Sequence, residues 1–389
     1  MKTVGIICEY NPFHTGHAHL LGEVREAETV ICLMSGNFVQ RGEAAIATPH
    51  TRAAMALAAG ADLVLELPFP YAAASARYFA TAGVRALSSL GTDTLAFGSE
   101  CADRTALLHA AARTLTADFE EKLANGAKNT GSAAAYFAAL GETRVGANDI
   151  LALEYTRAIL AENVAMDILP VPRVGEGFHS TDADAAYPSA TALRAALARG
   201  EDITDRLPRG AAAIWQNATK TGLAPADTAA LGGAMLALLR REWPAGEGEI
   251  AFGDIAECEG GLGAHLVRAA MRASDYTTLC REAATQKYTD ARIRRALLYI
   301  LAGVTRADLT VPPSYLRLLG ANEKGRAYLA DTRKTRTVPV VTKQSDIAAL
   351  GDAAERQRAL AAVADGLFAL CLARPTLPRE LATAAPLFV

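Results

Sequence analysis

The sequence predicts an α/β protein: a Rossmann-like, doubly wound parallel sheet followed by a mostly α-helical domain. In the first 200 residues, short continuous apolar runs alternate with Ala-rich stretches that suit helices. Beyond that point strand signals become sparse, while helical spacing of apolar residues continues. A length of 389 residues also suits about two domains. We place a catalytic domain at residues 1–205 and a helical domain at residues 206–389, because Pro208 and Gly210 mark a break.

Five apolar runs are the expected strands. Each is apolar along nearly its whole length, which is typical of parallel strands covered by helices on both faces. The expected strands are residues 3–8, 29–34, 62–67, 94–97 and 166–171, and the helices between them are residues 16–26, 49–59, 75–90 and 103–125. Right-handed crossovers between such strands produce the doubly wound arrangement.

The second half contains one good strand candidate, residues 337–341, and Pro339 would restrict it to a sheet edge. The remaining segments have helical composition and spacing. The expected helices are residues 228–242, 263–273, 290–301 and 347–371.

Composition excludes several classes of protein. The chain is 51% hydrophobic and 21% charged, too apolar to stay disordered. No apolar run reaches the roughly 18 residues of a membrane span, and the N-terminus does not resemble a signal peptide. We therefore expect a cytoplasmic protein without membrane contact. The six cysteines form no CxxC pair and have no close histidines, so we expect neither a metal site nor a disulfide framework.

Charge is distributed unevenly along the chain. The formal net charge is −3, yet residues 281–343 contain 13 basic and only 5 acidic side chains. One strongly basic segment in an acidic protein indicates a polyanionic partner such as RNA. A solvated helix face of ordinary arginine content is the alternative.

Two histidines, His14 and His17, lie where the first expected strand gives way to the first expected helix. Ligands of open parallel sheets bind at the carboxyl ends of the strands, and a helix N-terminus there favours phosphate oxygens. Gly16 between them lets a ligand approach the backbone. Both imidazoles could then stabilise charge developing on a phosphoryl group. The alternatives are two structural histidines, or a metal site, which is less favoured because no carboxylate accompanies them.

His14-Thr15-Gly16-His17 resembles the HxGH signature of the nucleotidyltransferase superfamily. More narrowly, the chain resembles the tRNA(Met) cytidine acetate ligases. The matching stretches include residues 5–17 (GIICEYNPFHTGH), 34–43 (MSGNFVQRGE), 60–69 (GADLVLELPF), 189–191 with Arg194, and 313–325 (PSYLRLLGANEKG). Pro49-His50 and Gly177-Phe178-His179-Ser180 depart from the family pattern, which leaves open a phosphate-facing lysine and a carboxylate near the nucleotide.

The resemblance implies an activity. Such ligases activate acetate with ATP to form acetyl-adenylate and pyrophosphate, then pass the acetyl group to N4 of the wobble cytidine of elongator tRNA(Met). It implies ATP, acetate and elongator tRNA(Met) as substrates and Mg²⁺ carried by the nucleotide, with no protein partner. His14 and His17 would be the catalytic residues. The residues carried over as ATP-binding are Ile7, Cys8, Glu9, Tyr10, Asn11, Pro12, Phe13, His14, Thr15, Gly16, His17, Ala18, His19, Leu20, Gly98, Asn148 and Arg173.

Several of these residues have a plain structural alternative. Gly98 could be a turn glycine, Asn148 a helix N-cap, and Arg173 a surface ion-pair partner. Residues 35–43 follow the second strand and should face the same crevice, where Phe38 would anchor the loop in the core rather than stack on a base. Glu66 suits a polar site group as well as a helix-flanking charge.

The basic segment would hold the tRNA backbone through Arg292, Arg294, Arg295 and Lys324. A small-molecule adenylyltransferase or pantoate-type ligase of the same superfamily is the alternative function, although it leaves the basic segment without a purpose. A nucleotide-sensing or RNA-binding protein without turnover is a third possibility.

Overall fold

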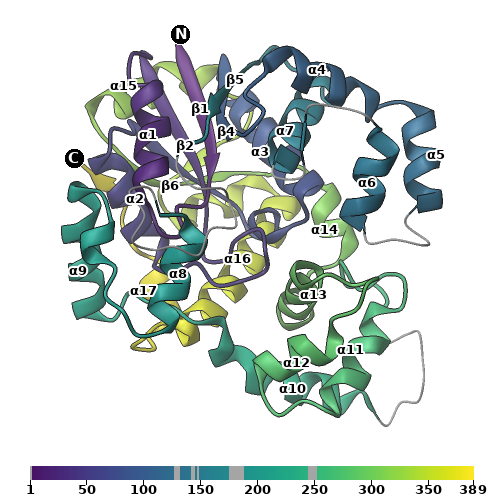
Figure 1. Ribbon diagram of the computed structural model, residues 1–389. Helices are drawn as coiled ribbons and strands as arrows, with labels where there is room; N and C mark the ends of the chain where they lie inside the picture. The colour runs from purple at the N-terminus through teal and green to yellow at the C-terminus, as the bar shows by residue number, and fades with distance from the viewer. Residues whose placement is uncertain (1, 127–131, 142–144, 147–148, 175–187, 244–251) are drawn as a thin grey trace.

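The computed structural model describes residues 2–126, 132–141, 145–146, 149–174, 188–243 and 252–389 (Figure 1). All five strands expected in the first half are present and parallel to their neighbours, in the order β5-β4-β1-β2-β3. They are β1 (Thr3–Cys8), β2 (Thr29–Ser35), β3 (Leu63–Leu67), β4 (Thr94–Ser99) and β5 (Asp167–Pro172). The predicted doubly wound core is therefore confirmed.

The sheet continues with strands from the second half of the chain. β6 (Leu316–Ala321) pairs antiparallel with β3, and β7 (Val340–Val341) and β8 (Leu387–Phe388) pair parallel with β6. The sheet is thus mixed, although mostly parallel. The sequence did not predict β6, because six residues that include three leucines also suit a buried helical turn. β7 ends the strand order, as Pro339 predicts, but is only two residues long.

Helices cover both faces of the sheet. α1 (Thr15–Glu23) and α2 (Pro49–Ala58) pack on one face, where alternate β1 and β2 side chains such as Val4 and Cys32 point. α3 (Ala76–Ser89) and α7 (Ile150–Ala161) cover the other face. Outside α3 and α7 lie α4 (Arg104–Arg113), α5 (Ala117–Gly126) and α6 (Ser132–Leu140).

One expected helix, residues 103–125, is divided into α4 and α5. Thr114 and Thr116 lie at the break, and their hydroxyls donate to the carbonyls of Ala111 and Arg113. Threonine hydroxyls that bond to nearby backbone compete with continued helix, so the break follows from local side-chain chemistry.

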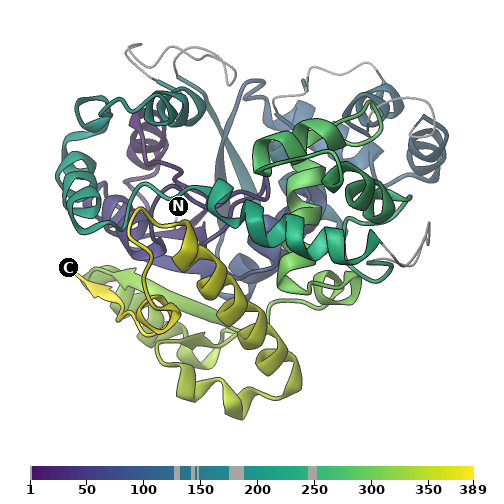
Figure 2. The ribbon, with the colours of Figure 1, turned by 90° about the horizontal axis from the view of Figure 1, so that it is seen from below.

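The helices that follow β5 fall into separate groups (Figure 2). α10 (Gly232–Arg241), α11 (Leu262–Ala270), α12 (Tyr276–Ala283) and α13 (Asp290–Ala302) pack together on the opposite side of the view from α8 (Ala190–Ala198) and α9 (Arg209–Thr221). After α13 the chain returns to the sheet, where it forms β6, β7 and β8. The helices of this last part are α14 (Arg306–Thr310), α15 (Glu323–Asp331), α16 (Asp352–Cys371) and α17 (Pro378–Ala382). A boundary near residue 205 stays a prediction, and the sheet extends across it.

Among the described residues, no helix combines the length and apolarity that crossing a bilayer demands.

Candidate active site

His14 and His17 cap α1 with each other's help. His14 is the N-cap residue, and its Nδ1 accepts a hydrogen bond from the backbone N–H of Gly16 at 3.0 Å. In return, His17 Nδ1 accepts from the backbone N–H of His14 at 3.3 Å. Two imidazoles thus form the reciprocal capping box that Ser or Thr usually makes with Glu. The helix N-terminus expected at this position is present.

These bonds fix how the rings carry their protons. Because Nδ1 of each ring accepts a backbone N–H, each neutral imidazole carries its proton on Nε2. The rings lie against each other with centroids 3.8 Å apart and an interplanar angle of 32°. Both residues are partly exposed, so two adjacent Nε2–H donors remain available to a ligand.

Both histidines stay neutral near pH 7. Burial, then the charges of Arg194 and Arg173, lowers the pKa of His14 to about 4. Burial, then His14 and Arg173, also lowers the pKa of His17 well below its usual value. A neutral N–H donor can bind phosphate oxygens without first taking up a proton from solvent.

Aromatic side chains hold His17 in place. The ring of Tyr10 meets it edge-on at a centroid distance of 4.9 Å, and that of Phe13 lies 5.7 Å away. Tyr10 and Phe13 are almost completely buried. Within the segment expected to bind ATP, they support the histidines from the core, whereas the histidines and Gly16 are partly exposed.

Positive charge gathers beside the histidines from two other elements. Arg173 follows β5, and a Cβ placed on Gly98 at the end of β4 would lie 3.4 Å from its Cγ. Arg194 on α8 donates through Nη1 to the carbonyl of Asn11 at 2.7 Å. The carboxyl ends of β1, β4 and β5 therefore bring Gly98, Arg173 and the histidines together, as the sequence predicts. Arg194 is a new member of the site, signalled earlier only by its family match.

The structure assigns a cap to Ser189, whose hydroxyl accepts the Ala192 N–H at 3.0 Å and so begins α8. Ser189 belongs to one of the stretches that match the family, and its cap is a structural role.

Arg52 is a site component that sequence reasoning missed. It is fully buried on α2 and donates to carbonyls at the ends of two strands, Glu9 and Ser35, at 2.6 and 3.0 Å. Further bonds reach the carbonyls of Gly36 and Ala47. Burial lowers its pKa to about 10, so the guanidinium stays charged. Arg52 ties the loop before α1 to the loop after β2.

That second loop, residues 35–43, is held by a hydrogen bond, by packing of an aromatic ring and by an ion pair. Glu9 Oε1 accepts the backbone N–H of Gln40 at 2.8 Å, and Phe38 is buried with its ring 6.1 Å from those of Phe69 and Phe368. The expectation that Phe38 anchors the loop in the core is confirmed. Glu43 forms an ion pair with Arg294 on α13. The loop therefore bridges the sheet and the helical group.

The basic residues predicted to contact tRNA have varied surroundings. Arg295 is 8% exposed and pairs with Glu257 at 2.8 Å, while Arg292 donates to the carbonyls of Glu257 and Glu259. Lys324 is exposed on α15, whose N-cap Asn322 bonds to Asp62 at the amino end of β3. Lys324 thus lies near the amino ends of the parallel strands, whereas His14 follows the carboxyl end of β1. The four predicted residues therefore do not form one surface.

Two features that the sequence singled out lie outside the residues that the structure describes. Asn148 and Gly177–Ser180 are not among the described residues. Next to Asn148, Asp149 accepts the backbone N–H groups of Glu100 and Cys101 at 2.7 and 2.9 Å. The beginning of α7 is thereby attached to the loop after Gly98.

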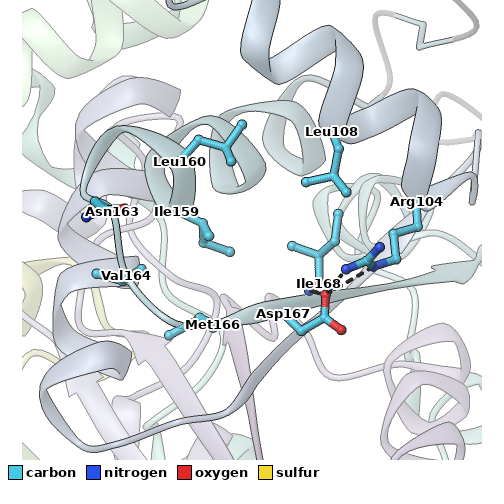
Figure 3. A pocket seen from close by; sticks show the side chains of 9 residues that line it. All are labelled: Arg104, Leu108, Ile159, Leu160, Asn163, Val164, Met166, Asp167 and Ile168. Carbon is cyan, nitrogen blue, oxygen red and sulfur yellow. Dashed lines mark hydrogen bonds and ion pairs between the residues drawn. The ribbon is translucent and has the colours of Figure 1, made fainter.

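A cavity of about 210 Å³ lies beside β5, the edge strand of the sheet. Figure 3 shows the side chains that line it. Its wall is mostly apolar, and Arg104 donates to Asp167 at the first residue of β5. Because Asp167 is at the amino end of its strand, this cavity lies away from the carboxyl ends that carry the histidines. The candidate active site is instead at His14 and His17, because their Nε2–H donors lie beside the positive charges of Arg173 and Arg194. Among the described residues, no cluster of three or more His, Cys, Asp or Glu could hold a metal ion.

Known proteins are similar to this chain in sequence and in fold. Residues 1–378 match the family model HIGH Nucleotidyl Transferase. The tRNA(Met) cytidine acetate ligase of Syntrophotalea carbinolica is 38% identical over 374 residues, covering 89% of this chain and 86% of that protein. That of Acetivibrio thermocellus is 31% identical and covers 96% of both chains.

Solved structures agree. The crystal structure of Thermotoga maritima TmcAL, apo form I, superposes with a TM-score of 0.91 at 28% identity and covers 100% of both chains. The form II crystal structure of the same protein, bound with alpha-thio ATP, gives a TM-score of 0.88 and covers 100% of this chain and 99% of that one.

Proposed function

Because this chain belongs to the tRNA(Met) cytidine acetate ligase family of HIGH nucleotidyl transferases, we propose that it joins acetate to N4 of the wobble cytidine of elongator tRNA(Met). It is an ATP-dependent ligase, as the named relatives and the ATP-analogue complex of its structural neighbour support. The observation that carries the proposal is the pair of neutral histidines, each with Nε2–H free of the capping bonds, beside Arg173 and Arg194.

In the first step, a carboxylate oxygen of acetate attacks the α-phosphorus of ATP. The oxygen–phosphorus bond forms while the bond to the β-phosphate oxygen breaks, which releases pyrophosphate and leaves acetyl-adenylate. Donors at the start of α1 stabilise the charge that develops on the phosphoryl oxygens. Arg173 and Arg194 offset the charge of the departing pyrophosphate.

The nucleoside end of ATP would lie along the ends of β4 and β5. Gly98 offers bare backbone there, against which a ribose or adenine can pack closely. Mg²⁺ would be carried by the phosphates of the nucleotide, where it would offset their charge.

The second step explains why the acid is activated first. A carboxylate is a poor acyl donor, and the exocyclic amine of cytidine is a weak nucleophile. AMP is a far better leaving group, and the remaining barrier is lowered by holding the amine against the mixed anhydride. The N4–carbon bond forms and the carbon–oxygen bond to AMP breaks, with loss of one N4 proton. For this the wobble base must leave its stack.

We place the tRNA contact on α13 and its surroundings, because Glu43–Arg294 joins that helix to the loop beside the nucleotide. Arg292 and Arg294 are both partly exposed on this side, whereas Arg295 is buried.

The test measures pyrophosphate release from ATP and acetate, with and without elongator tRNA(Met), followed by nucleoside analysis of the tRNA. The proposal expects acetate-dependent turnover and one N4-acetylcytidine at the wobble position. Turnover without acetylated cytidine would support a small-molecule ligase, and binding without pyrophosphate release would contradict an enzyme.

A further inference from the structure

A second polar site lies at the same sheet edge as the histidines, two strands further along. Glu66 near the end of β3 is the register partner of Arg317 on β6. Because β6 runs antiparallel to β3, the start of β6 meets the carboxyl ends of the parallel strands. Asp365 on α16 joins them in lining one pocket. We call these three residues the β3–β6 triad.

The triad is close to the loops that hold the nucleotide site. A Cβ on Gly36 would come within 2.1 Å of Glu66 Oε1, so the Glu66 carboxylate rests on the glycine that follows β2. Arg52 bonds to the carbonyl of that same glycine and to that of Glu9, where β1 ends. Arg52 therefore connects the glycine beside the Glu66 carboxylate to the residue at the end of β1.

The triad is not a closed structural ion pair. Arg317 Nη1 approaches Glu66 Oε2 only to 3.8 Å, beyond hydrogen-bond distance, while its Nη2 donates to the carbonyls of Leu381 and Ala382. Asp365 is 6% exposed and accepts from Asn37 Nδ2 at 2.6 Å. Asn37 Oδ1 is buried without a hydrogen-bond partner. A closed structural network would satisfy this acceptor, so the network around Asp365 is incomplete.

Two carboxyl groups and one guanidinium line this pocket, and the pKa values of both carboxyl groups are raised. Burial raises the pKa of Glu66, while Arg317 and Arg52 oppose the rise. Burial, then the charge of Glu66, raises the pKa of Asp365 to about 7. The other charged groups at the pocket are Lys343 and Arg358. His50 on α2 lies near Arg317, whose charge contributes to a lowered pKa.

The pocket's chemistry suits a nucleobase that bears an amino group. Cytosine presents N4–H donors beside the acceptors N3 and O2, and carboxylates are the side chains that pair with N4. Arg317 and Lys343 can donate to O2, and Tyr315, Val341 and Ile347 supply apolar wall for the ring faces. Uracil would direct its O4 acceptor at the carboxylates, and a phosphate would be repelled by them.

We propose that the β3–β6 triad is the acceptor site for the wobble cytosine, with Glu66 and Asp365 bound to its N4 amino group. This assignment rests on the proposed ligase function. In the transfer step, N4 forms its bond to the acetyl carbon, AMP departs with the electron pair of the broken carbon–oxygen bond, and the N4 proton passes to the carboxyl pair and then to solvent. A group that titrates near neutrality suits such a proton transfer.

The experiment separates the two half-reactions in Glu66→Gln and Asp365→Asn. Acetate-dependent pyrophosphate–ATP exchange reports the first step, and single-turnover formation of N4-acetylcytidine on tRNA reports the second. We expect exchange within about twofold of the unmodified protein and transfer slowed by at least about 100-fold, in the range of general-base and positioning effects. Asp346→Asn is the matched control, because Asp346 is an exposed carboxylate in the neighbouring segment.

Three results would overturn the assignment: unchanged transfer, exchange lost together with transfer, or equal losses in the control. A second measurement compares binding of anticodon stem-loops with wobble cytidine and wobble uridine. The unmodified protein should favour cytidine by roughly 5- to 100-fold, and Glu66→Gln should reduce that preference. No preference in the unmodified protein would also contradict the site. Absence of acetate-dependent exchange in the unmodified protein would instead overturn the proposed function.

Discussion

His17 Nδ1 accepts the backbone N–H of His14 at 3.3 Å. This bond gives the His17 ring a structural role in addition to the phosphate-binding role that we propose for it. The same bond that begins α1 fixes the proton on Nε2, the atom that we propose donates to the phosphates. The same side chain therefore caps α1 and presents the Nε2–H donor, so a substitution of His17 affects both helix stability and the donor.

Replacing His17 with Ala removes one of two phosphate donors and half of the capping box. We expect turnover to fall by roughly 10²–10³-fold, as for loss of one preorganised donor, and stability to fall by only about 1 kcal/mol. Steady-state pyrophosphate release and urea unfolding measure the two effects. His109→Ala on the exposed face of α4 serves as the control. Near-normal turnover in His17→Ala would remove the histidines from the mechanism.

Acid should destabilise the protein through His14. The unfolded chain protonates this histidine near pH 6.5, whereas the folded pKa is about 4, so the unfolded state binds more protons between these values. Stability is therefore lost as pH falls from 6.5 towards 4, by about 1–3 kcal/mol from this residue after allowance for its partial exposure. Urea unfolding at pH 7 and pH 4.5 should show a smaller loss in His14→Gln. An equal loss in both proteins would contradict a buried neutral His14.

Arg52→Met should destabilise the fold strongly. The substitution leaves the carbonyls of Glu9, Ser35, Gly36 and Ala47 without their donor, and we expect a cost of at least about 3 kcal/mol. Arg77→Met, which breaks only the exposed pair with Glu120, should cost less than about 1 kcal/mol. Similar unfolding midpoints for the two variants would show that Arg52 does not organise the strand ends.

Salt titration of tRNA binding tests the place of α13. If Arg292 neutralises one phosphate, Arg292→Ala should reduce the slope of log affinity against log salt by about 0.7–0.9. ATP affinity should not change. Lys324→Ala, near the amino ends of the parallel strands, provides the comparison, and a larger slope change there would move the tRNA contact away from α13.

Sequence patterns predicted the parallel core because β1 to β4 are largely buried and all five of its strands read as nearly continuous apolar runs. β6 escaped prediction because Arg317 interrupts its short run, and its position depends on pairing with β3, far away in the chain. His14 and His17 were predicted from their place between a strand and a helix, whereas Gly98 and Arg173 were implied by the family resemblance. The sheet topology brings all four to the carboxyl ends of β1, β4 and β5.

Other features depend on partners that sequence alone does not reveal. A basic segment is visible in composition, but Glu43 and Glu257, which pair with Arg294 and Arg295, come from distant parts of the chain. The role of Arg52 is hidden for a similar reason, since its partners are backbone carbonyls rather than a recognisable acidic residue.

A crystal structure of this chain with a non-hydrolysable ATP analogue tests the central claim most directly. We expect phosphate oxygens within about 3 Å of Nε2 of both His14 and His17, with Arg173 and Arg194 alongside. Nucleotide bound with its phosphates away from the beginning of α1 would contradict the account.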